Sequence, residues 1–127
     1  MRVPFLLLMF MRIAALVQVI VGIGLWTGHL YSLVNVHRTI GVLFVLALWS
    51  IAVIALVQRR GIGLAFFAVM WGVVVAAVGF TQHLLLPGDL HWIVRVLHLV
   101  IALASMPIAE RLTRKTSPAV AGQVASN

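Results

Sequence analysis

Residues 33–57 read LVNVHRTIGVLFVLALWSIAVIALV, and no charged side chain follows Arg38 until Arg59. A transmembrane helix needs about 20 mostly apolar residues, so this stretch is long enough to cross a bilayer. Three other stretches share this character, at about Ile13–Tyr31, Ile62–Leu86 and Leu90–Ala109. None shows the alternating pattern of lipid-facing barrel strands. The sequence therefore predicts an all-α integral membrane protein with four spans.

The overall composition favours the same class. The chain has 127 residues, of which 64% are hydrophobic and 9% are charged, and its mean hydropathy is +1.19. Soluble domains average about 45–50% apolar and about 25% charged residues. A soluble enzyme, a disordered chain and a nucleic-acid-binding domain are thereby excluded, despite the net charge of +7. The absence of cysteine excludes disulfides, thiolate metal ligands and cysteine nucleophiles.

Breaks in the apolar pattern divide the chain. Gln58-Arg59-Arg60-Gly61 reads as a tight charged turn, and Leu86-Pro87-Gly88-Asp89 reads as a Pro-Gly turn whose Asp89 caps the next helix. We expect residues 1–12 to be an interfacial lead-in that lies along the membrane surface. Residues 13–111 then form the four-span bundle, and residues 112–127 form a flexible cytoplasmic tail.

The basic residues are distributed unevenly between the two sets of span ends. Only Arg38 and Arg95 fall at one set of ends. The other set carries Arg2, Arg12, Arg59, Arg60, Arg111, Arg114 and Lys115. Because basic residues are enriched on the cytoplasmic side, both termini are expected in the cytoplasm, in a prokaryotic inner membrane. The turns at residues 28–35 and 85–90 then face outward.

Two short stretches indicate a repeated hairpin. WTGHL at residues 26–30 ends span one, and FTQHL at residues 80–84 ends span three. Each is followed by a turn and a helix that carries a histidine, His37 or His98. A duplicated hairpin is one interpretation and chance similarity is the other. Short connections make successive helices antiparallel neighbours, with spans two and four on one diagonal of a four-helix bundle.

The five histidines provide the candidate site, since all of them fall toward the outer ends of the spans. Ionisable groups inside a membrane are costly and usually mark function. His37 lies about one turn inside span two, and His98 lies on the order of 13 Å along span four. Imidazole is a good iron ligand, and helical bundles hold cofactors between side chains on facing helices. We therefore expect His37 and His98 to be the axial ligands of a haem.

Neighbouring residues fit this expectation. Gly41 follows His37 by one turn and leaves room for a flat ring, while Arg38 and Arg95 suit the carboxylates of the haem propionates. One face of span four carries His91, Arg95, His98, Ala102 and Ser105.

Other interpretations of the same residues stay open. His37 and His98 can instead form a polar contact between helices. Arg38 and Arg95 can bind lipid phosphate. His29 and His91 suit interfacial or capping positions. If His29 and His83 converge, they can hold a second haem or a metal.

Two segments resemble the haem A synthase family. QVIVG at residues 18–22 with HRTIG at residues 37–41 is similar to the first hairpin of one four-helix half of those enzymes. WGVV at residues 71–74 with HLVIA at residues 98–102 is similar to the second. The resemblance covers about residues 14–109 and implies a haem held between His37 and His98. The catalytic half of the family carries a glutamate where this chain has Val34, and the family's outer-loop cysteine pair is absent.

Three functions are compatible with these observations. The first is a b-type haem protein that transfers electrons near the outer face, with a quinol or an extracytoplasmic redox protein as partner. The second is a reduced haem A synthase-like enzyme, for which a haem of the A type is possible. The third is an accessory structural subunit of a larger respiratory or photosynthetic complex. A homo-oligomer in the lipid bilayer is also expected, and nucleic acid is not.

Overall fold

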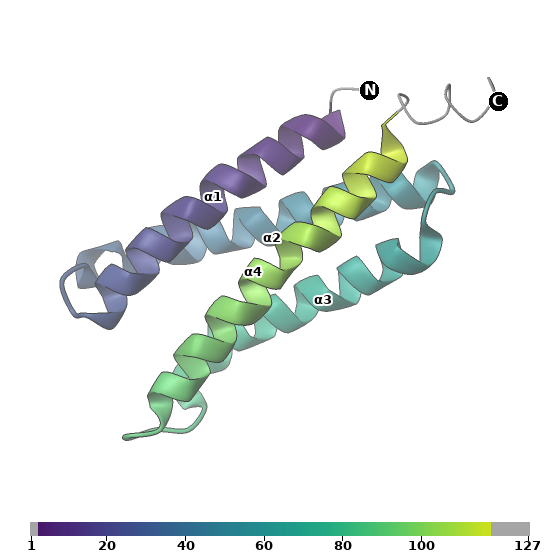
Figure 1. Ribbon diagram of the computed structural model, residues 1–127. Helices are drawn as coiled ribbons and strands as arrows, with labels where there is room; N and C mark the ends of the chain where they lie inside the picture. The colour runs from purple at the N-terminus through teal and green to yellow at the C-terminus, as the bar shows by residue number, and fades with distance from the viewer. Residues whose placement is uncertain (1–2, 118–127) are drawn as a thin grey trace.

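The computed structural model describes residues 3–117 as four long helices joined by short connections (Figure 1). In chain order the elements are α1 (Val3–Trp26), η1 (Tyr31–Leu33), α2 (Val34–Val57), α3 (Ile62–Thr81), η2 (Gln82–Leu84) and α4 (His91–Thr116). No strand occurs in this part of the chain. All four long helices are long and apolar enough to cross a membrane. The prediction of an all-α chain with four candidate spans is therefore confirmed.

Successive helices run antiparallel, and α2 contacts the three others (Figure 1). Spans two and four were expected to lie diagonally across the bundle. In the structure the corresponding helices, α2 and α4, pack directly against each other. Ala52 and Ala55 on α2 and Ser105 and Ala109 on α4 are fully buried. Small side chains of this kind let helix backbones approach closely in a membrane.

The two ends of the bundle differ in charge and in burial. We call the end that carries Arg12, Arg59, Arg60, Arg111, Arg114 and Lys115 the basic end, and the opposite end the histidine end. Most of the fully buried large side chains, such as Met11 and Leu112, lie toward the basic end. In contrast, no residue of 22–43 or 76–93 is buried. Figure 1 shows the α1–α2 and α3–α4 hairpins diverging toward η1 and η2.

Two tryptophans join helices in the middle of the bundle. The indole Nε1 of Trp49 on α2 donates to the carbonyl oxygen of Val69 on α3, at 3.1 Å. The indole Nε1 of Trp71 on α3 donates to the carbonyl oxygen of Ile101 on α4, at 3.0 Å. A Cβ on Gly72 would collide with the Trp49 ring, so glycine at this position admits the indole. Side-chain bonds therefore link α2, α3 and α4 in sequence.

The start of the first helix differs from the expectation for residues 1–12. From Val3 onward these residues belong to α1, and Leu8 and Met11 are buried in the bundle instead of lying along a surface. The Arg12 charge, which suggested a boundary, is paired with Glu110 at 2.7 Å. Pro4 lies in the first turn of α1, where a missing N–H costs nothing.

The end of the last helix also differs from the expectation. α4 continues to Thr116, and Leu112, Thr113 and Thr116 are buried, so residues 112–116 are not a tail. Residues 118–127, the rest of the predicted flexible tail, lie outside the described residues.

Both predicted turns are present and contain left-handed residues. Arg59 and Gly61 have φ of 53° and 65°, and Leu86 and Gly88 have φ of 44° and 92°. The predicted cap at Asp89 is wrong, because Leu90 precedes α4 and no side chain caps the helix. The chain needs the left-handed conformation to reverse direction within so few residues.

Gly61→Ala is expected to lower the free energy of unfolding by about 1–2 kcal/mol, since a Cβ is unfavourable at a left-handed position. Gly63→Ala is the matched control, because Gly63 is helical and a Cβ there would meet no atom within 4 Å. The control should be neutral or slightly stabilising. Thermal unfolding in detergent, followed by circular dichroism, measures both; equal stability of the two variants would contradict the expectation.

Candidate functional site

His37 and His98 come from α2 and α4. His37 lies in the first turn of α2, and His98 lies two turns into α4; both side chains are half-buried. The two helices α2 and α4 contact each other. The fold thus places the two residues that the sequence singled out on contacting helices, and their shared ligand stays a prediction.

Each of these imidazoles has a nitrogen without a partner. The Nδ1 atoms of His37 and His98 are buried and make no hydrogen bond within the described residues. Leaving a buried polar atom unpaired costs about 1–3 kcal/mol. Ordered water, a metal ion or another polar ligand can remove that cost. Each buried Nδ1 therefore lacks a polar partner that the described residues could supply.

A glycine of the preceding helix adjoins each ring. A Cβ on Gly22 of α1 would lie 3.5 Å from Cε1 of His37, and one on Gly79 of α3 would lie 3.2 Å from Cε1 of His98. In each hairpin, the histidine ring of the second helix thus packs against a glycine of the first helix. Nothing in the sequence singled out Gly79, because its role depends on which face of α3 turns toward α4.

Gly41 does not have the role expected for it. A Cβ on Gly41 would lie 3.0 Å from Nε2 of Gln18, so the side chain of Gln18 occupies the space that the glycine leaves. The same Nε2 donates to the carbonyl oxygen of His37 at 3.0 Å, and the Oε1 of Gln18 is buried without a partner. Gln18 is therefore a polar neighbour of the site that the sequence left without a role.

The two arginines of the histidine end are placed differently. Arg95 is half-buried, and its guanidinium carbon lies 5.9 Å from the centroid of the Trp26 ring, a cation–π contact that joins α4 to α1. Arg38 is exposed and makes no ion pair within residues 3–117. Only Arg95 is therefore held by a contact with another helix.

The remaining histidines have local contacts in the connections between helices. Nδ1 of His29 lies 3.1 Å from the Thr27 hydroxyl, and Nδ1 of His91 lies 3.1 Å from the carbonyl oxygen of Leu85. His83 is exposed in η2. Within the described part of the chain, no group of three or more histidine or acidic side chains is placed to hold a metal ion. A second site at His29 and His83 stays a prediction.

The pairing of His37 with His98 is not what a strict repeat would give. The spacing from His29 to His37 equals the spacing from His83 to His91, so a repeat would equate His37 with His91. The structure instead leaves His91 bonded to the preceding turn and places the ring of His98 beside Gly79 of α3. The duplicated hairpin therefore stays a prediction, and it does not by itself account for the site.

Comparison with known proteins adds no family to this geometry, since no protein-family model, curated protein or solved structure matches the chain. The similarity to haem A synthases consequently rests on the residues quoted above.

Gly79→Ala is expected to be less stable than Gly22→Ala by about 1 kcal/mol. Replacing glycine by alanine stabilises a helix by about 1 kcal/mol at either position. The difference in stability between the two variants therefore reports the contact with the imidazole. The 3.2 Å approach at Gly79 forces His98 to move, whereas 3.5 Å at Gly22 is an ordinary contact. Thermal unfolding in detergent measures the difference in stability. A Gly22→Ala variant that is less stable than Gly79→Ala would refute this geometry.

Proposed function

We propose that the chain is a b-type haem-binding membrane protein in which His37 and His98 ligate the iron. The observation that carries the proposal is a half-buried imidazole on each of the contacting helices α2 and α4, each with a buried Nδ1 that lacks a partner within the described residues. Bound between two histidines, a haem supplies one-electron transfer and has no open coordination position for oxygen. Electron transfer is accordingly the proposed activity.

The surroundings of the pair are compatible with a planar ligand. Gly22 and Gly79 let each ring pack against the preceding helix, and no residue of 22–43 or 76–93 is buried. A ligand inserted where the two hairpins diverge would cover apolar surface that is exposed there. The proposal does not need Gly41, whose space Gln18 occupies.

The charged side chains of the histidine end are suited to the carboxylates of a haem. Arg38 and Arg95 are the two cations of the histidine end, and arginine binds carboxylates through paired hydrogen bonds. We assign them to the haem propionates, with Trp26 holding the guanidinium of Arg95 in place. If the basic end faces the cytoplasm, the redox partner is a quinol or a protein on the outer side.

Haem binding is tested by the reduced-minus-oxidised absorption spectrum of the detergent-purified chain from cells that supply haem, with pyridine extraction for stoichiometry. A sharp low-spin signal with about one haem per chain is expected. His37→Ala and His98→Ala should each abolish it. His91→Ala is the matched control on α4 and should keep it. An unchanged spectrum in both ligand variants, or equal loss in the control, would refute the assignment.

The propionate assignment has its own test. Arg95→Gln and Arg38→Gln are each expected to speed haem loss by about tenfold, the effect of removing one charge-assisted hydrogen bond of about 1.4 kcal/mol. Arg59→Gln at the basic end makes the same change in charge and should leave the rate unchanged. The rate is measured by transfer of haem to an excess of an apoprotein acceptor. Equal rates in all three variants would remove the two arginines from the site.

The enzyme-like alternative rests on the resemblance to haem A synthases. The chain has two acidic residues, Asp89 in a turn and Glu110 at the basic end. Neither adjoins the paired histidines, so an oxidation that needs a carboxylate beside the haem has little support from the described residues. Analysis of extracted haem after co-expression separates the two functions, because a modified haem would favour the enzyme. A colourless chain that purifies with a larger complex would instead favour an accessory subunit.

A further inference from the structure

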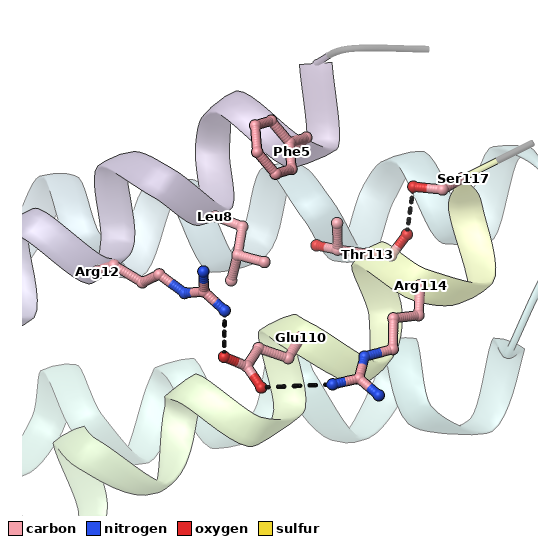
Figure 2. A pocket seen from close by; sticks show the side chains of 7 residues that line it. All are labelled: Phe5, Leu8, Arg12, Glu110, Thr113, Arg114 and Ser117. Carbon is pink, nitrogen blue, oxygen red and sulfur yellow. Dashed lines mark hydrogen bonds and ion pairs between the residues drawn. The ribbon is translucent and has the colours of Figure 1, made fainter. Parts of the chain in front are cut away.

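A pocket of about 270 Å³ opens between α1 and α4 at the basic end of the bundle, away from the histidines. Its lining combines apolar and polar side chains, as Figure 2 shows: Phe5, Leu8, Arg12, Glu110, Thr113, Arg114 and Ser117. The haem proposal uses none of these residues.

The pocket has an excess of positive charge. Nη2 of Arg12 lies 2.7 Å from one carboxylate oxygen of Glu110, and Nη2 of Arg114 lies 4.0 Å from the other (Figure 2). One carboxylate thus serves two guanidinium groups, both of which are partly exposed. Arg59, Arg60, Arg111 and Lys115 add further charge at this end of the bundle. An anion that enters the pocket therefore meets a positive potential and free N–H donors.

Thr113 supplies an additional donor. Its side chain is 5% exposed, and its Oγ1 is buried with no hydrogen-bond partner. The neighbouring hydroxyls do have partners. Those of Thr116 and Ser117 donate to the backbone carbonyl oxygen of Thr113, at 3.0 Å and 2.9 Å. Figure 2 shows the Thr113 hydroxyl on the side that faces Leu8, within the pocket. This unpaired group points to a ligand that accepts a hydrogen bond.

We propose that this pocket binds the phosphate of an anionic phospholipid headgroup. Arg12 and Arg114 pair with the phosphate oxygens, the Thr113 hydroxyl donates to one of them, and Phe5 and Leu8 pack against the adjoining apolar part of the lipid. Arginine suits phosphate because it offers paired donors, and basic pockets near a membrane surface attract anionic lipids. In the absence of lipid, Glu110 holds the two guanidinium groups and competes with the phosphate for them.

The test titrates the full chain in detergent with dioleoyl-phosphatidylglycerol or dioleoyl-phosphatidylcholine, and counts bound lipid by native mass spectrometry. Arg114→Gln and Thr113→Val are each expected to weaken phosphatidylglycerol binding by about tenfold. Thr113→Ser keeps the hydroxyl and should keep the binding. Glu110→Gln should strengthen it, because the competing carboxylate is gone. Circular dichroism of each variant checks that it is folded.

Arg111→Gln is the matched control, since Arg111 is exposed on the same helix, does not line the pocket and makes the same change in charge. Binding should be unchanged in this variant. If Arg111→Gln and Arg114→Gln weaken lipid binding equally and Thr113→Val has no effect, the lipid is attracted to the basic surface in general. That result would overturn the pocket as the binding site. Inorganic phosphate that displaces the lipid at equal concentration would overturn the lipid as the source of the anion.

Discussion

The close approach of α2 and α4 is the constraint on which the rest of the bundle depends. In a membrane, lipid chains are as apolar as leucine, so helices associate through fit and not through the hydrophobic effect. Ala52, Ala55, Ser105 and Ala109, small residues of these two helices, are fully buried toward the basic end. These two helices each carry one of the candidate histidines, and each also contacts both α1 and α3.

The same constraint gives the two ends different properties. Among the described residues, the pockets toward the basic end lie at the surface, one between Arg12 and Arg114 and another between α1 and α2. Divergence of the hairpins at the histidine end leaves apolar helix surface uncovered around two polar rings. The two proposals therefore concern separate ligands, a planar cofactor at one end and a lipid headgroup at the other, and the failure of one leaves the other intact.

The number and class of the helices could be predicted because long uncharged stretches have few alternatives to a membrane span. The start of α1 could not be predicted, because the charge of Arg12 is balanced by Glu110, which lies 98 positions away in the sequence. Residue type was enough to single out His37 and His98. Gln18, Gly79 and Thr113 were missed because their roles depend on which face of a helix turns toward its neighbour.

The indole bonds of Trp49 and Trp71 have a mechanical consequence. They tie α2 to α3 and α3 to α4 through carbonyl oxygens at mid-height, where no water competes for the donors. Sliding one of these helices along the next would break a bond that lipid cannot replace. Any relative motion of α2, α3 and α4 that keeps both bonds therefore has to pivot about the level of the two tryptophans.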